Sequence, residues 1–152
     1  MTPLTLPPCS LTLREREGRT EVLDIVRRRY VALTPEEWVR QHVVHALHYQ
    51  LGYPLELIQV EGAISLNGMK KRCDIVVYAP GVKPLMIVEC KKPEVKLTQS
   101  VADQACRYNL VHKVPYLYLT NGLQHIVCRV DEENQKLDQI VQLPRWEELI
   151  GE

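Results

Sequence analysis

The sequence predicts an α/β protein with a central mixed β-sheet of about five strands flanked by helices. Three observations carry this prediction: a helix with a strong start signal, three strand-like runs joined by tight turns, and a second helix followed by two more strands. The chain has 152 residues, of which 45% are hydrophobic and 25% charged, so it has room for one globular domain rather than two. We expect residues 1–33 to be an N-terminal arm and charged segment, and residues 34–152 to be a single domain.

The N-terminal segment is expected to lie outside the core. Residues 1–13 are rich in Pro, Leu and Thr without a helical period, and residues 13–25 hold alternating Arg and Glu that read as a solvated stretch. Arg27, Arg28 and Arg29 could contact phosphate, but an ordinary basic surface is the simpler interpretation.

The first helix has clear signals at both ends. Thr34 suits the N-cap, Pro35 the first helical position, and Glu37 the position from which a capping-box carboxylate reaches back. Gly52 ends the helix. Apolar residues recur between them at i, i+4 spacing: Val39, Val43, Leu47 and Leu51.

The remaining elements follow from apolar runs bounded by turn residues. Strands are predicted over residues 55–66, 72–78, 84–91, 115–119 and 124–130. Asn67-Gly68 is a two-residue hairpin turn, and Asn121-Gly122 is a second turn. Helices are predicted over residues 98–111, capped by Thr98 or Ser100, and 144–150.

Composition limits the classes of protein. No apolar run of 18 residues occurs, so no membrane-spanning helix is expected, and without a secretory signal we expect a cytoplasmic protein. The five cysteines form no C-x-x-C pair, so we expect reduced, mostly buried thiols. The net charge is zero, but residues 67–113 carry nine Lys and Arg against four Asp and Glu. This local surplus is compatible with a polyanion partner.

The residues that could carry chemistry lie on two neighbouring strands. Alternate residues of a strand share a face, so Glu89 and Lys91 project together. A hairpin folded about residues 81–82 sets Asp74 opposite Glu89. Two carboxylates can hold a hard divalent cation, which activates water and polarises a phosphate, while an ammonium stabilises developing charge. By the residues alone, an ion pair between Glu89 and a lysine at an exposed strand edge explains the pattern as well.

Several stretches are similar to one family, in the same order and across residues 30–130. Asp74 followed by Glu89-Cys90-Lys91 resembles the PD-(D/E)XK nuclease superfamily. The wider set resembles the N-terminal nuclease domain of type I restriction enzyme R subunits and its stand-alone relatives. The matching residues are 33–41, 51–54, 71–77, 87–91, 104–109 and 119–122.

The resemblance implies a restriction-endonuclease-like core and a DNA endonuclease or phosphodiesterase that depends on Mg²⁺ or Mn²⁺. It implies that Asp74, Glu89 and Lys91 are catalytic, and that Asp74, Glu89 and the backbone carbonyl of Cys90 hold the metal. Glu37 matches an acidic residue that helps to bind metal in the superfamily, although its capping position explains it equally. Cys73 stands where the family often has Pro.

Further residues receive accessory roles from the same resemblance. Gln104 and Tyr108 match the Q-x-x-x-Y element, and their spacing places both on one helical face. Glu61 could join the acidic residues, but a solvent-facing position is the more ordinary expectation. Basic residues flanking the site could bind phosphate or simply form a solvated rim: Lys70, Lys71, Arg72 and Lys92.

An alternative function stays open at this point. The chain could be a catalytically weak or inactive nucleic-acid-binding subunit that works through a partner, such as another protein of a restriction system. No Walker A motif is present, so no motor is expected within the chain. The three helix histidines lack metal-site spacing, so no zinc site is expected: His42, His45 and His48. A homo-oligomer is compatible with the sequence.

Overall fold

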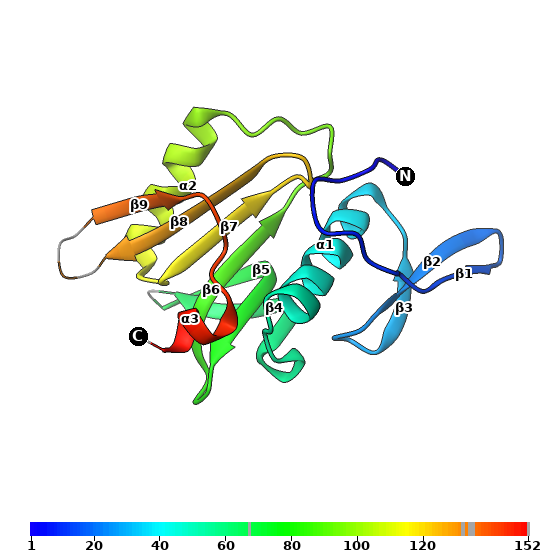
Figure 1. The fold of residues 1–152 in the computed structure, drawn as a ribbon, viewed down its shortest axis with the longest axis horizontal. Coiled ribbons are helices and arrows are strands. Elements are labelled where there is room, and N and C mark those ends of the chain that lie inside the picture. The colour runs from blue at the N-terminus through cyan, green and yellow to red at the C-terminus, as the bar shows by residue number, and fades with distance from the viewer. Residues whose placement is uncertain (67, 132, 134–135, 152) are drawn as a thin grey trace.

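The protein is built on two antiparallel or mixed sheets in a computed structural model that describes residues 1–66, 68–131, 133 and 136–151. The smaller sheet is β1 (Leu13–Arg16), β2 (Arg19–Asp24) and β3 (Arg29–Ala32). The larger has six strands in chain order: β4 (Ile58–Leu66), β5 (Met69–Ala79), β6 (Lys83–Cys90), β7 (Tyr116–Thr120), β8 (His125–Asp131) and β9 (Lys136–Ile140). The predicted mixed sheet is confirmed, and β9 is an additional strand. Figure 1 shows both sheets, with the smaller one to the right.

The large sheet is mixed because of one crossover. All neighbouring strands pair antiparallel except β6 and β7, which are parallel. Helix α2 (Gln99–His112) connects these two strands, as a parallel pair requires a long crossover. The strand β7 is buried at every residue, as expected of a strand covered on both faces.

Two apolar clusters lie on opposite faces of the large sheet. The first packs α1 (Pro35–His45) against the sheet and includes Val43, Val88 and Tyr118. The second lies under α2 and includes Ile87 and Leu117. Neighbouring residues on a strand therefore fall in different clusters, in accord with the two-residue strand period. Glu89 lies two residues beyond Ile87 on β6 and so belongs to the α2 face.

The helix start predicted at Thr34 is confirmed. Its side-chain oxygen accepts a hydrogen bond of 3.0 Å from the backbone N–H of Glu37, and Pro35 begins the helix. The apolar stripe is buried at Val39, Val43 and Leu47 and partly buried at Leu51, and the helix continues as a π-helix over Ala46–Gln50. The carboxylate of Glu37 does not close a capping box, because it accepts hydrogen bonds from arginine side chains instead.

The later elements agree closely with the sequence. Thr98 caps α2 through a hydrogen bond from the N–H of Val101, and the short helix α3 covers Trp146–Ile150. The turn at Asn121 is held by its side-chain oxygen, which accepts from the backbone of Leu123 and Gln124. A short 3₁₀ turn over Leu55–Leu57 comes before β4, so the strand starts later than predicted. Of the predicted Asn67-Gly68 turn, Asn67 lies outside the described residues.

The N-terminal segment differs from the expectation of an arm and a solvated stretch. Residues 13–32 form the small sheet, in which Val22 and Asp24 are fully buried. The first residues run along the body: the N–H of Thr5 donates to the carbonyl of Gly122 at 2.8 Å, and Trp38 Nε1 donates to the carbonyl of Thr2. The strands could not be predicted from the alternating Arg and Glu residues, because few of these positions are apolar.

The expectation that all thiols are reduced is wrong for one pair. Cys106 on α2 and Cys128 on β8 form a disulfide, with their Cα atoms 5.8 Å apart. Cys73 and Cys90 are free and buried as expected, and Cys9 is free and partly exposed. No helix in the described part of the chain is long and apolar enough to cross a membrane.

Candidate active site

The β5–β6 hairpin brings the two predicted carboxylates together. Ile75 lies opposite Val88 and Val76 opposite Ile87, which is the register that a turn at residues 81–82 predicts. Asp74 and Glu89 are the next positions along this hairpin. The backbone N–H of Cys90 donates a 2.7 Å hydrogen bond to Oδ2 of Asp74, which fixes that carboxylate against the end of β6.

Glu89 carries a buried oxygen without a hydrogen-bond partner. Its Oε1 atom is shielded from solvent and accepts no hydrogen bond, and the nearest cation is Lys71, whose Nζ lies 3.9 Å away. Burial raises the pKa of Glu89 to about 7, and the nearby Asp74 carboxylate adds to this rise. An unsatisfied buried acceptor is costly, which is typical of a position that holds a ligand.

The carboxylate pair fits a hard divalent cation. Such ions prefer oxygen ligands, and Mg²⁺ is usually bound by one or two carboxylates with the other positions filled by water or substrate oxygens. Oε1 of Glu89 accepts no hydrogen bond and lies beside Asp74, so the two carboxylates offer oxygen atoms of the kind that such an ion prefers. Among the described residues, no three His, Cys, Asp or Glu side chains are grouped to hold a metal, so side chains would supply only part of the coordination.

A groove of about 390 Å³ lies between β6 and α2, on the face to which Glu89 projects. Lys71 lies over the ring of Tyr108, with Nζ 4.9 Å from the ring centroid. Asp74 does not line the groove, whereas its neighbour Glu89 does. The structure therefore brings together five of the residues assigned from the sequence on the groove wall: Lys71, Glu89, Lys91, Gln104 and Tyr108.

Behind Asp74 lies an ion cluster that the sequence analysis did not find. The guanidinium of Arg40, on α1, contacts both Glu37 oxygens, Glu61 at 3.2 Å, and Oδ1 of Asp74 at 3.6 Å. Its side chain is 8% exposed. Arg40 thus ties the first helix to the Asp74 carboxylate. Its spacing of three residues from Glu37 is the only sequence signal for it.

A second arginine extends this cluster to the small sheet. Arg27 contacts Glu37 and Glu61 at 3.1 Å and Asp24 at 2.7 Å. Asp24 also accepts a hydrogen bond from Gln41 at 3.0 Å. The guanidinium of Arg27 therefore pairs with three carboxylates and is not available as the phosphate contact that the sequence allowed.

The remaining assigned residues lie outside the lining of the groove. Lys70, Arg72 and Lys92 are exposed, as phosphate-binding side chains must be. Glu61 is exposed, as expected, and it is also a member of the ion cluster, because its carboxylate pairs with Arg27, Arg40 and Arg72. Glu37, predicted as a metal ligand, is occupied by Arg27 and Arg40, so a metal would have to displace an arginine to bind it. The role of the Cys90 carbonyl stays a prediction.

Comparison with known proteins supports the family. The sequence family of the type I restriction enzyme R protein N terminus (HSDR_N) matches residues 35–144. This chain belongs to that family. The match includes Asp74, Glu89 and Lys91 but not the small sheet β1–β3.

The fold is also similar to a solved structure. A fragment described as an HsdR subunit of a type I restriction enzyme from Vibrio vulnificus YJ016 superposes with a TM-score of 0.53 at 21% sequence identity. The similarity covers 80% of this chain and 25% of the fragment, so this chain corresponds to about a quarter of that structure's length. No curated protein matches the chain.

Proposed function

We propose that this domain of the R-protein N-terminal family is a PD-(D/E)XK nuclease with a restriction-endonuclease-like core, and that it hydrolyses phosphodiester bonds in DNA. Asp74, Glu89 and the Cys90 carbonyl would hold Mg²⁺ or Mn²⁺. The observation that carries the proposal is the buried Oε1 of Glu89, which accepts no hydrogen bond and lies beside Asp74 and in one groove with Lys91.

The groups around the groove have separable roles. A bound divalent ion would supply Lewis acidity toward a phosphate oxygen and acidify a coordinated water. The ammonium of Lys91, on the same groove wall as Glu89, is placed to stabilise negative charge that develops on the phosphate. Gln104 and Tyr108 form the opposite wall on α2, where they can orient the substrate backbone.

The cations behind and beside the acid pair have a positioning role. Arg40 holds Oδ1 of Asp74 from the α1 side, and Lys71 lies against Glu89 from the groove side. Both reduce the repulsion between the two carboxylates when no metal is bound. To bind the metal directly, the Glu37 carboxylate would have to give up its contact with Arg27 or Arg40. The exposed Lys70, Arg72 and Lys92 would bind phosphates at the rim.

The test is cleavage of supercoiled and linear DNA, single- and double-stranded, in Mg²⁺, Mn²⁺ or EDTA. The variant is Lys91→Ala, and Lys83→Ala is its matched control because it removes an exposed lysine at the other end of β6. We expect cleavage that needs metal and falls by about 100-fold or more in Lys91→Ala, with Lys83→Ala unchanged. Cleavage in EDTA, or equal rates in Lys91→Ala and wild type, would overturn the assignment.

The second candidate is a nucleic-acid-binding subunit with little or no cleavage of its own. It is favoured by the cations at the acid pair, since Lys71 and Arg40 already neutralise Glu89 and Asp74. In the same assay this function predicts DNA binding without cleavage in either metal. Adding a partner protein from a restriction system would then restore cleavage, and Lys91→Ala would abolish it again.

A further inference from the structure

The small sheet β1–β3 places its arginines on one face. Residues directly opposite in an antiparallel pair share a face, and Arg14 pairs with Glu21, Arg16 with Arg19, and Leu23 with Tyr30. The other face carries Val22 and Asp24, which are fully buried against the body. The first face therefore points to solvent, and we call it the arginine face: Arg14, Arg16, Arg19, Glu21, Leu23 and Tyr30.

Two of these arginines oppose each other without compensation. Arg16 and Arg19 are exposed and directly paired across the hairpin, and like charges in this position are destabilising. Neither forms an ion pair with any residue that the structure describes. Glu17 occupies the turn with Gly18, and both have the positive φ of a type I′ turn.

The acidic residues nearby are engaged elsewhere. Glu21 binds the guanidinium of Arg14 at 2.7 Å, and Arg14 in turn stacks 3.8 Å above the ring of Tyr30. Glu15 lies on the opposite face, where it accepts a hydrogen bond from Thr20 at 2.6 Å. The arginine face thus keeps three arginines against one glutamate, and its unmatched charge sits at Arg16 and Arg19.

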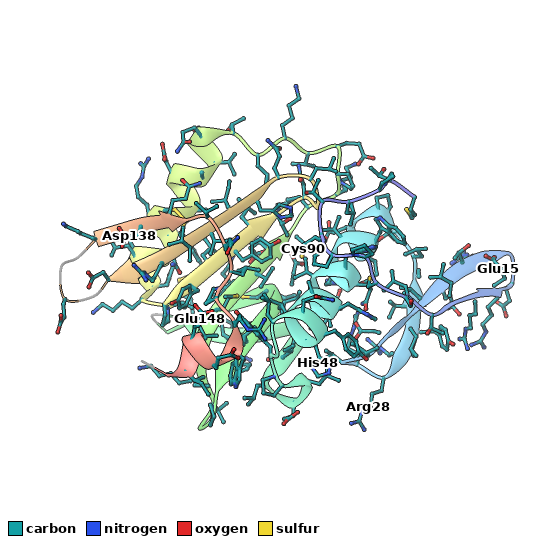
Figure 2. The ribbon with its side chains drawn as sticks, in the orientation of Figure 1. Glu15, Arg28, His48, Cys90, Asp138 and Glu148 are labelled. Atoms are coloured by element: carbon teal, nitrogen blue, oxygen red, sulfur yellow. A yellow bond between two sulfur atoms is a disulfide. The ribbon has the colours of Figure 1, made fainter. Side chains whose placement is uncertain are left out.

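The sheet is joined to the active-site region through the ion cluster. Arg27, in the turn between β2 and β3, contacts Glu37 and Glu61, and Glu61 also lies 3.9 Å from Arg72 on β5. The sheet extends from the body beside α1 (Figure 1), and Arg28 at its β2–β3 turn points away from the body (Figure 2). The ion cluster therefore connects the small sheet to Asp74 through Glu37 and Arg40.

We propose that the β1–β3 sheet is a DNA-binding arm, in which Arg16 and Arg19 contact the phosphate backbone of duplex DNA. Guanidinium groups bind phosphate oxygens in a planar, bidentate geometry, and a polyanion removes the repulsion between the two arginines. The proposal deepens the proposed nuclease function and rests on it. Residues 13–32 precede the family match at residues 35–144, so this arm is a feature of this chain beyond the matched core.

The test is the affinity for a labelled 30-bp duplex, measured by fluorescence anisotropy in EDTA between about 50 and 200 mM salt. Each phosphate contact contributes about 0.9 to the slope of log K against log salt. We expect the double variant Arg16→Gln/Arg19→Gln to lower the magnitude of that slope by about 1.8 and to weaken binding by about tenfold or more. The variant Arg16→Lys/Arg19→Lys keeps both charges and should keep the slope.

The control is Lys83→Gln/Lys136→Gln, which removes two exposed charges from strands of the large sheet. An equal loss in this control, an unchanged slope in the arginine variant, or no duplex binding by the wild-type protein would overturn the arm. Thermal unfolding checks that each variant is folded. The nuclease function is judged separately, by metal-dependent cleavage of DNA. Cleavage together with an unchanged salt slope in the arginine variant would overturn only the DNA-binding arm. The expected change of slope without any cleavage would overturn only the nuclease.

Discussion

Asp74 and Glu89 are similar side chains that meet very different surroundings. Both Asp74 oxygens face a donor, the Cys90 backbone N–H on one side and Arg40 on the other. Oε1 of Glu89 is buried and has no hydrogen-bond partner. Asp74 is therefore held in place, while Glu89 offers the oxygen that is free to take a new ligand.

The ion cluster makes a prediction for acid stability. Burial alone would raise the pKa of Asp24, but hydrogen bonds from the Arg27 backbone and side chain and from Gln41 lower it below its ordinary value. The pKa of Glu37 is lowered in the same way, where hydrogen bonds from Arg40 outweigh its burial. A lowered folded-state pKa gives stability that is present above the unfolded value, near 4, and is lost as the pH falls through the folded-state value.

The measurement is urea unfolding of wild type and Asp24→Asn between pH 7 and pH 3. We expect Asp24→Asn to lose about 3 kcal/mol at pH 7, because it leaves Arg27 without its closest buried partner. The difference should narrow below about pH 4, where the Asp24 carboxyl group of the unfolded chain takes up a proton before that of the folded protein does. The exposed pair is the control: Asp138→Asn, next to Arg129, should change stability by less than about 1 kcal/mol. A pH-independent difference for Asp24→Asn would contradict this account.

Among the elements, those with local signals could be predicted and those that depend on tertiary contacts could not. The cap at Thr34, the Asn121 turn and the register that joins Asp74 to Glu89 all follow from a few adjacent residues. The strands β1–β3 were missed because their solvent face is charged, and only positions such as Val22 are buried. Arg40 was missed because its partners come from separate strands.

The disulfide gives a prediction for helix α2. Cys106 and Cys128 are 22 residues apart, and a closed loop of this size is worth about 3 kcal/mol of stability. We expect Cys106→Ser, or a reductant with wild type, to lower the free energy of unfolding by about that amount. Cys9→Ser is the control, since Cys9 is unpaired. Since α2 carries Gln104 and Tyr108, the loss should be accompanied by weaker cleavage. A melting temperature that does not respond to reductant would contradict this.

The molecule as a whole consists of a family core and an added N-terminal sheet. The α/β class, the mixed sheet and the two flanking helices were predictable, because local apolar periodicity and turn residues mark these elements along residues 34–130. The family match over residues 35–144 covers this part. Two features join segments that are far apart in the chain: the contact of Thr5 with Gly122 in the β7–β8 turn, and the ion cluster. No local sequence pattern encodes such contacts.

The proposed nuclease depends on a divalent metal site at the Asp74–Glu89 pair. The most direct measurement is anomalous diffraction from crystals soaked in Mn²⁺, for wild type and for Glu89→Gln. We expect an anomalous peak between the Asp74 and Glu89 carboxylates in wild type, and its loss in Glu89→Gln. No peak there in wild type, or a peak that persists unchanged in Glu89→Gln, would contradict it.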